Sequence, residues 1–386
     1  MPGKLSSPVL VDSRRPTSAT AGNAFPDMVH LPAFVSHFRQ LAQSELEVDR
    51  RILASHPFLR GLPTVPDSFG VDLQQPPTPA ELQRVLSRMK SGSAPGPDGL
   101  PTEFYKTLWP VLCDFFCGVL RFFFEEQLLP PSFRLGRLVL LPKGAGSPHD
   151  PGAWRPITLL NADYKILAAV LSSRMQVVLP DLINLRQTCS VPGRAIYTLT
   201  ALTRDVLEYS RTRRANGLLV SLDQDKAFDR AEHGYLFSVL SAFGLPSSSV
   251  ALFESLYGDM QSELFVNGVL AARFPVTRGV RQGCPLSPLL FVLCIEPFLV
   301  GIDRSSSVRG FLLPGTGQLK ASAYADDVTL YARDGDSVLG ALQVFDEYGA
   351  LSGARLNRTK SKIMCIDDHR AAPCRSPSVH PLPFWG

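Results

Sequence analysis

Two adjacent carboxylates, Asp326 and Asp327, are the residues whose types and spacing first suggest chemistry in this 386-residue chain. They lie between two short apolar segments, 319–324 and 328–332, a pattern that predicts a hairpin with the acids at its tight connection. Successive strand side chains point to opposite faces, so one acid can face inward while the other supports it. Adjacent negative charges favour a neutralising cation, which indicates a divalent-metal site. A solvated, aspartate-rich turn is the alternative, because aspartate is common in turns.

A third carboxylate, Asp223, follows the apolar segment 217–222, which has the composition of a buried strand. An acid at the end of that strand can lie beside the hairpin if the two belong to one antiparallel sheet. Three carboxylates at one place could hold two Mg²⁺ ions, because Mg²⁺ prefers carboxylate and phosphate oxygens. Two such ions suit in-line displacement at phosphorus, with one activating a hydroxyl and one bracing a triphosphate.

Between these acids, residues 278–290 read RGVRQGCPLSPLL. The glycines and prolines predict a rigid turn that leads into an apolar helix. Within the turn, Arg281 and Gln282 offer planar donors to a nucleotide or a template. Taken alone, the segment is no more than a junction between a loop and a helix.

A basic hairpin is predicted upstream. The strand segment 135–141 is followed by Lys143, and a glycine-containing loop leads to Arg155. A glycine-flexible hairpin that carries these two cations could fold over a triphosphate. The alternative is a solvated hairpin without a ligand.

The elements around these motifs are mostly helical. Apolar periodicity predicts helices over 31–56, 162–178 and 197–214. A further helix runs from a Thr78 cap to about residue 90. After a Pro/Gly-rich turn at 93–101, another helix opens at Thr102 and is expected to break at Pro110.

The composition places the protein inside the cell. Seven cysteines without a CxxC pair indicate reduced thiols, and the N-terminus lacks the apolar core of a signal peptide. The most apolar run, 288–302, is too short for a membrane span. We therefore expect a nuclear or cytoplasmic protein that is not secreted and has no membrane partner. A net charge of +4 means that a nucleic-acid partner would be bound by a local basic surface. The oligomeric state stays open.

Taken together and in order, these blocks resemble a known family. The acidic block at 223–229, the block at 278–288 and the YADD block at 324–327 look like motifs A, B and C of reverse transcriptases. The amino-acid sequences of these motifs are similar to those of the non-LTR, LINE-type retrotransposons. Residues 94–100 and 154–161 resemble fingers motifs of that family, and residues 352–361 resemble its motif D. The likeness covers about residues 58–366.

The resemblance implies an α+β fold with the fingers and palm of a right-hand polymerase, in which helices back an antiparallel palm sheet. The expected division is an N-terminal tail and helical linker (1–75), a reverse transcriptase domain (76–366) and a Pro-rich tail (367–386). Within the domain, the fingers would occupy about 90–210 and the palm about 211–366. Because the chain ends soon after motif D, we expect the thumb to be largely absent.

The resemblance also implies the catalytic acids and the partners. Asp223, Asp326 and Asp327 would be the catalytic, metal-binding carboxylates for two Mg²⁺ ions. The reaction would transfer a dNMP unit from a dNTP to a primer 3′-hydroxyl, and the partners would be an RNA template, a DNA primer and dNTPs. The alternative is a truncated, catalytically inactive remnant of an element that at most binds nucleic acid.

Five further residues match nucleotide-contacting positions of the family. Phe228 would pack under the sugar and exclude a ribose 2′-hydroxyl, or else be a core residue. Gln282 would lie against the incoming nucleotide, and Lys143 and Arg155 against its phosphates. Lys360 would assist proton transfer to pyrophosphate, or else be a solvated lysine.

Overall fold

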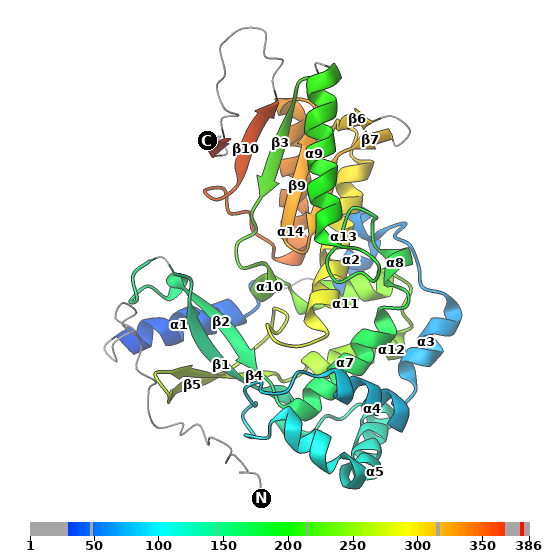
Figure 1. The fold of residues 1–386 in the computed structure, drawn as a ribbon, viewed down its shortest axis with the longest axis vertical. Helices are drawn as coiled ribbons and strands as arrows, with labels where there is room; N and C mark the ends of the chain where they lie inside the picture. Colours follow the sequence, from blue (N-terminus) through cyan, green and yellow to red (C-terminus); the bar gives the residue numbers. More distant parts are fainter. Residues whose placement is uncertain are drawn as a thin grey trace, which may run out of the picture.

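In the computed structural model of the chain, the described residues are 30–46, 49–144, 146–213, 215–313, 317–366 and 379–381. They form a four-stranded sheet, a five-stranded sheet and a two-stranded ribbon. Figure 1 shows the two larger sheets at separate places, with helices packed around both. The fold is α+β, as the sequence predicts.

The five-stranded sheet carries the acids, and all its neighbouring strands are antiparallel. In spatial order, the strands are β11 (Val379–Pro381), β10 (Lys362–Ile366), β3 (Gly217–Leu222), β9 (Asp327–Ala332) and β8 (Ala321–Tyr324). Leu222 of β3 lies opposite Val328 of β9, and Tyr324 pairs with Asp327 where the β8–β9 hairpin closes. The predicted hairpin and its predicted neighbouring strand are both confirmed.

Helices cover both faces of this sheet. In Figure 1, α9 (Ile196–Arg213) lies in front of the strands and α14 (Gly335–Ser352) lies behind them. The adjoining α13 (Ser287–Arg304) is buried along most of its length. It is the apolar helix expected after the turn at 278–290, and it joins the sheet to the helical part of the molecule.

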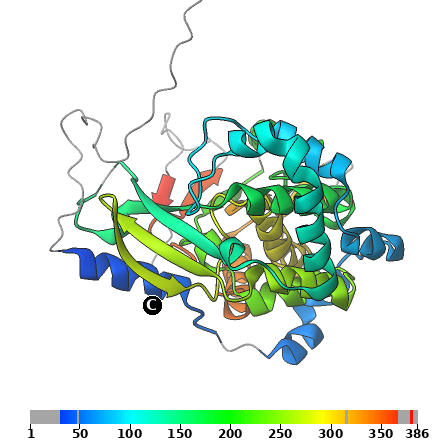
Figure 2. The ribbon, with the colours of Figure 1, turned by 90° about the horizontal axis from the view of Figure 1, so that it is seen from below.

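The four-stranded sheet mixes parallel and antiparallel pairs. Its strands are β2 (Trp154–Leu159), β1 (Leu135–Pro142), β4 (Gln261–Val266) and β5 (Val269–Pro275), in that spatial order. β1 and β2 form the predicted hairpin, and β1 pairs in parallel with β4. Figure 2 shows α1 (Leu31–Ala42) lying along this sheet. Phe34 and Phe38 of α1 pack against Leu138, Trp154 and Phe274 of the sheet.

The remaining helices surround one large core. They are α2 (Arg50–Ser55), α3 (Asp67–Gln74), α4 (Pro79–Arg88), α5 (Thr102–Glu126), α6 (Pro131–Arg134), α7 (Ala162–Met175), α8 (Leu179–Leu182), α10 (Ala227–Arg230), α11 (His233–Ala242) and α12 (Ser247–Tyr257). Short 3₁₀ helices η2 (Pro57–Leu59) and η3 (Pro151–Ala153) and the ribbon of β6 (Phe311–Leu313) and β7 (Gly317–Leu319) complete the described elements. The start of α4 is confirmed, because Thr78 and Glu81 form the predicted capping box.

Two helix predictions are wrong. The single helix predicted over 31–56 is two helices, α1 and α2, because the segment between them turns to place Glu45 against the guanidinium of Arg278. The break predicted at Pro110 is absent, and α5 continues through it. A proline costs the helix one hydrogen bond there, and the buried Trp109 and Phe116 keep both sides of the helix packed on the core.

Helix α5 is also notable for its surface. Among the described residues, it is the one helix that is long and apolar enough to cross a membrane, judged by length and composition alone. Several of its apolar side chains, including Val111 and Phe115, are exposed.

Candidate active site

The three predicted carboxylates lie at one end of the five-stranded sheet. Asp223 directly follows β3, and the β3–β9 register continued by one residue places it opposite Asp327. Asp326 lies in the two-residue turn of the hairpin, after Ala325, whose φ of 53° is left-handed. Gln187 Oε1 accepts a hydrogen bond from the Ala325 N–H at 3.1 Å, which holds this turn. Asp326 is half-buried and Asp327 is exposed, so only one acid of the pair is directed into the protein.

The ionisation of Asp223 and Asp326 is influenced by burial and by the charges around them. Burial raises the pKa of Asp223, the cation of Lys360 lowers it, and the charge of Asp327 raises it further. Burial also raises the pKa of Asp326, and Asp327 and Asp223 both add to this effect. The ionised acids are therefore destabilised by their surroundings, which favours a cation beside them.

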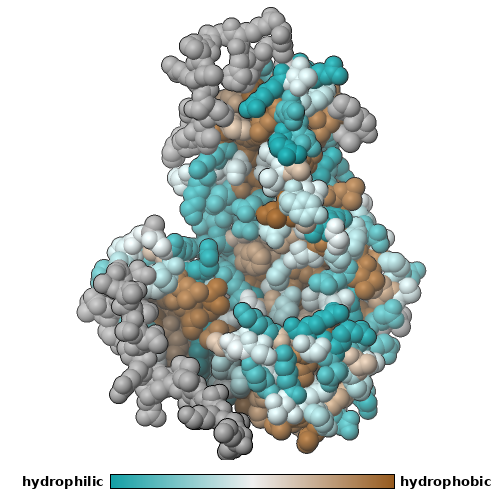
Figure 3. Space-filling view, viewed as in Figure 1, coloured by the Kyte–Doolittle hydropathy of each residue, from teal (hydrophilic) through white to brown (hydrophobic). Residues whose placement is uncertain are grey.

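A cavity of about 440 Å³ lies between the acids and the four-stranded sheet. Figure 3 shows a notch between the lobe around that sheet and the body above it. Seven of the eight predicted site residues line the cavity, namely Lys143, Arg155, Asp223, Phe228, Gln282, Asp326 and Lys360. The eighth, Asp327, is not among the lining residues. The structure therefore places the predicted acids and the predicted cations on the walls of one cavity.

Phe228 forms part of the cavity wall beside Asp223. It is the second residue of the short helix α10, which follows β3, and it is half-buried. Its ring stacks on Phe291 of α13, with the centroids 4.5 Å apart and the planes 12° from parallel. The ring is thus held rigidly by the core on one side while it lines the cavity.

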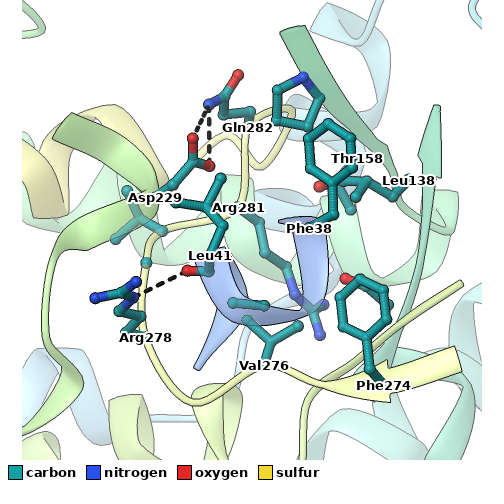
Figure 4. A pocket seen from close by; sticks show the side chains of 15 residues that line it. Phe38, Leu41, Leu138, Thr158, Asp229, Phe274, Val276, Arg278, Arg281 and Gln282 are labelled. Carbon is teal, nitrogen blue, oxygen red and sulfur yellow. Dashed lines mark hydrogen bonds between the residues drawn. The ribbon is translucent and has the colours of Figure 1, made fainter. Parts of the chain in front are cut away.

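Gln282 is fixed by hydrogen bonds at both ends. Its carbonyl oxygen accepts from the Thr158 N–H of β2 at 2.9 Å. Its side-chain Nε2 donates to both carboxylate oxygens of Asp229, at 3.2 and 3.3 Å (Figure 4). Burial raises the pKa of Asp229 to about 6, against the lowering effect of Lys226 and of the Gln282 hydrogen bond. Asp229 is a site residue that sequence reasoning did not identify, although it belongs to the same block as Asp223 and Phe228.

The three predicted cations are exposed, whereas Asp223 and Asp326 are half-buried. Lys143 Nζ donates to the Gly152 carbonyl at 2.8 Å. Arg155 is exposed, and within the described residues its guanidinium makes no hydrogen bond or ion pair. Lys360 is exposed on a turn in which Asn357 donates its N–H to the Asp223 carbonyl at 2.7 Å. Within the described residues, the side chains of Arg155 and Lys360 are thus positioned mainly by their backbone and not by hydrogen bonds of their own.

The prediction that Arg281 offers its donors to a nucleotide or template is corrected. Its guanidinium donates to the carbonyls of Phe133 and Arg134, at 3.1 and 2.5 Å. It also lies over the ring of Tyr164, 5.2 Å from the centroid. Arg281 therefore ties the turn at 278–290 to the end of α6, just before β1, and it lines the cavity beside Gln282 with these donors already engaged.

Sequence reasoning missed the contribution of α1 to the cavity. His37, Phe38 and Leu41 of this helix line it. The Leu41 carbonyl accepts from Arg278 Nε at 2.9 Å, which fastens the helix to the turn at 278–290 (Figure 4). The sequence of α1 shows only helical periodicity, and that signal does not say which distant surface a helix covers.

The donor set fits a divalent cation that is shared with a substrate. Among the described residues, no group of three His, Cys, Asp or Glu side chains is close enough to hold a metal ion. Mg²⁺, however, is commonly bound through one or two carboxylates together with substrate phosphates and waters. Asp223 and Asp326 line a cavity that cationic side chains also line, and this suits that mode of binding.

Comparisons with known proteins show which family the chain resembles. A family model described as "Reverse transcriptase (RNA-dependent DNA polymerase)" matches residues 141–385. An uncharacterised 149 kDa protein of transposon TX1 from Xenopus laevis is 39% identical over 302 residues, which are 78% of this chain and 23% of that protein. A Pol polyprotein from the type-2 retrotransposable element R2DM of Drosophila melanogaster is 28% identical over 75% of this chain and 26% of its own length.

The chain thus spans about a quarter of the length of these two curated relatives. Among solved structures, an apo telomerase from Candida tropicalis aligns with a TM-score of 0.45 and 14% identity, over 65% of this chain and 53% of that one.

Proposed function

This chain belongs to the reverse transcriptase family, among the proteins of non-LTR, LINE-type retrotransposons, and from that membership we propose that it is the RNA-directed DNA polymerase part of such an element. The observation that carries the proposal is the cavity between the two sheets. Asp223 and Asp326 line it from the five-stranded sheet, and Lys143 and Arg155 line it from the β1–β2 hairpin. That arrangement suits a nucleoside triphosphate whose reacting phosphorus faces the acids and whose outer phosphates face the cations.

The proposed reaction is nucleotidyl transfer. The 3′-hydroxyl oxygen of the primer bonds to the α-phosphorus of a dNTP, the bond from that phosphorus to the bridging oxygen breaks, and pyrophosphate leaves. The proton of the hydroxyl passes to water. Catalysis of this kind depends mainly on positioning and on neutralising charge, and both requirements match what the cavity offers.

Asp223 and Asp326 would hold the divalent metal, with Asp327 beside them. When bound, Mg²⁺ would neutralise phosphate charge and lower the pKa of the attacking hydroxyl. Two ions per site are part of the proposal. The chain's own contribution is to hold two carboxylates at fixed places through the pairing of β3 with β9 and through the Ala325 turn.

The other lining residues would select and orient the nucleotide. The Phe228 ring, held against Phe291, would occupy the space that a ribose 2′-hydroxyl needs and so favour dNTPs. Arg155 and Lys143 would bind the outer phosphates. Gln282 would lie along the nucleotide, and Lys360 would stand near the leaving pyrophosphate.

The proposed complex also contains an RNA template and a DNA primer. We infer both partners from the family relationship. The relatives' names connect them with retrotransposable elements, and a polymerase of such an element copies RNA. A basic surface that binds nucleic-acid backbones makes affinity fall steeply with salt.

The test is primer extension on an RNA template with dNTPs and Mg²⁺. We compare the wild-type chain with an Asp326→Asn, Asp327→Asn double variant, and use Asp346→Asn as a matched control. Asp346 lies on an exposed part of α14 outside the cavity. Extension by the wild type and the control, with loss in the double variant, supports the proposal. A folded wild-type chain that extends no primer would favour the inactive-remnant alternative.

A further inference from the structure

Helix α1 contributes a wall of the cavity that the family relationship does not explain. The family match begins at residue 141, whereas His37, Phe38 and Leu41 of α1 line the same cavity as the acids. Phe38 and Leu41 also belong to the apolar core between α1 and the four-stranded sheet. His37 is the polar member of this group, and its position therefore calls for a separate explanation.

His37 contacts a lysine, Lys226, which lines the same cavity. Lys226 Nζ and His37 Nε2 are 2.9 Å apart, a distance at which one of the two nitrogens must lack a proton on the side that faces the other. The ammonium of Lys226 is the donor, and the neutral imidazole accepts. Burial lowers the pKa of both groups. The pair is therefore two nitrogen bases held together without an anion between them.

The charges of Asp225 and Asp229 raise the pKa of Lys226, but each of these acids makes its hydrogen bonds to another residue. Asp225 forms an ion pair with Arg230 at 3.0 Å, and the Asp229 carboxylate accepts both hydrogen bonds from Gln282. Within the described residues, Lys226 forms no ion pair, and His37 is the hydrogen-bond partner of its ammonium. A half-buried ammonium that these two carboxylates stabilise only through space, without a direct ion pair, gains from a further anion beside it.

The pair is held in place by backbone on both sides. Lys226 has a φ of 50°, a left-handed conformation that is uncommon for a lysine. The turn around it is anchored by the Asp225 N–H, which donates to the Arg355 carbonyl at 2.8 Å. On the other side, the Thr277 N–H donates to the Ala42 carbonyl at 2.8 Å and so fixes the end of α1. Strained backbone that is over-determined by its surroundings is a feature of ligand sites.

We propose that His37 and Lys226 form a phosphate-binding pair that receives the triphosphate of the incoming nucleotide together with Lys143 and Arg155. The inference rests on the proposed function and deepens it, because it extends the nucleotide site onto α1. A triphosphate brings several negative charges and many acceptor oxygens. Lys226 can then turn its protons to a phosphate oxygen, and His37 can donate from Nε2 as its other neutral tautomer or as imidazolium.

The pair also explains why α1 is tied to so many parts of the site. The helix packs on the four-stranded sheet through Phe34 and Phe38, and its end is bound by the turn at 278–290 through Arg278. A phosphate bound between His37 and Lys226 would connect α1 directly to the β3 end of the five-stranded sheet. The nucleotide would then be held by residues from both sheets and from the helix that joins them.

The test separates phosphate binding from primer–template binding. We measure the KM for dNTP, the inhibition constant of tripolyphosphate and the Kd for primer–template in the full chain. The variants are His37→Leu, Lys226→Met and the double variant. The control is Arg39→Gln, because Arg39 lies on the same helix, is exposed and does not line the cavity. Thermal unfolding of each variant checks that it is folded.

We expect the KM for dNTP and the inhibition constant of tripolyphosphate to rise by about tenfold in each single variant, the size of one lost hydrogen bond to a charged group. The Kd for primer–template should not change, and the control should match the wild type. A His37→Gln variant, which keeps a donor, should recover much of the lost affinity. These results together would support the proposal that His37 and Lys226 bind the triphosphate.

Two outcomes overturn it. One is a folded double variant with wild-type values for dNTP and tripolyphosphate, which would leave the proposed polymerase function intact and remove only the pair. The other is an equal loss of primer–template affinity, which would assign the residues to nucleic-acid binding instead. If the wild-type chain binds no dNTP and extends no primer, the proposed function fails and the pair fails with it.

Discussion

The acids Asp223 and Asp326 and the hairpin cations Lys143 and Arg155 line one cavity from different sheets, and the two pairs are held in different ways. The five-stranded sheet provides Asp223 and Asp326 from a strand end and a hairpin turn, where strand pairing and the Gln187 hydrogen bond fix the backbone. The four-stranded sheet provides Lys143 and Arg155 from a hairpin, where the side chains are exposed. The acids are therefore set by backbone geometry, whereas the cations lie at the ends of flexible side chains.

This difference teaches which contacts the protein builds in advance. Carboxylates that share an ion must be placed within a narrow tolerance, and strand register gives that precision. Cations that meet outer phosphates can adjust, because the phosphate charge attracts them over a range of positions. We expect substitutions among the acids to remove activity and substitutions among the cations to weaken it by degrees.

The largest effect is expected within the acids themselves. Asp223→Asn should lower the primer-extension rate by on the order of a thousandfold or more, since a bound metal supplies several kcal/mol of charge stabilisation. Asp327→Asn should cost less, roughly tenfold to a hundredfold, because Asp327 is exposed and does not line the cavity. Single-turnover extension rates at saturating dNTP measure both.

Circular dichroism and thermal unfolding should show that both variants are folded. Equal losses for Asp223→Asn and Asp327→Asn would contradict the distinction between a lining acid and a supporting one. It would mean that the exposed acid turns inward when substrate binds.

A smaller effect is expected at Phe228, which we propose to pack against the sugar of the nucleotide. Phe228→Ala should weaken discrimination against rNTPs by roughly 10- to 100-fold, which is the usual effect on specificity of adding or removing a small group in a pocket. The reason is that the Phe291 stack fixes the ring and leaves it no room to retreat. The ratio of kcat/KM for dNTP and rNTP measures this. Phe228→Tyr keeps the bulk and should behave as the wild type, and an unchanged ratio in Phe228→Ala would reject the steric role.

The cations should show the mildest catalytic effects. Arg155→Gln should raise the KM for dNTP by about tenfold with little change in kcat, since its guanidinium is unpaired within the described residues and free to meet a phosphate. Lys143→Gln should have a smaller effect, because Lys143 already donates to the Gly152 carbonyl. Steady-state kinetics on a fixed primer–template compare the two increases in KM. A larger increase for Lys143→Gln than for Arg155→Gln would contradict this prediction.

The acidic side of the site could be predicted from the sequence because its signals are local. The apolar run before Asp223 predicts a strand, the hairpin pattern around Asp326 predicts a turn, and the capping box at Thr78 predicts a helix start. All three are present in the structure. In each case, a few consecutive residues contain the physical cause, which is strand alternation, turn preference or a side-chain cap.

Several contacts around the site could not be predicted because their causes are long-range. Arg281 has the chemistry of a ligand-binding residue, yet its donors are taken by carbonyls nearly 150 positions earlier in the chain. Glu45 ends α1 early because it meets Arg278, 233 positions away. His37 faces Lys226 only because α1 docks on the four-stranded sheet. No window of sequence contains both members of any of these pairs.

The smallest effect concerns stability and has the opposite sign to the effect on activity. Burial and the neighbouring acids raise the pKa of Asp326 in the folded chain. A raised pKa favours the protonated carboxyl, so its contribution to stability is present below the unfolded pKa of about 3.9 and is lost as the pH rises through the folded pKa. At pH 8 without divalent metal, the ionised side chain therefore opposes folding.

Asp326→Asn should accordingly be more stable than the wild type at pH 8 in EDTA, by at most about 1 kcal/mol, since solvent reaches the half-buried carboxylate and weakens the effect. The advantage should shrink as the pH is lowered towards 4. Thermal unfolding midpoints at several pH values measure it, with the exposed Asp346→Asn as control. An acid whose removal stabilises the chain is held in its position despite unfavourable burial and the neighbouring charges, whereas the exposed cations carry no such cost. Substituting Arg155 should therefore leave stability unchanged, and a less stable Asp326→Asn would mean that the acids are placed for folding.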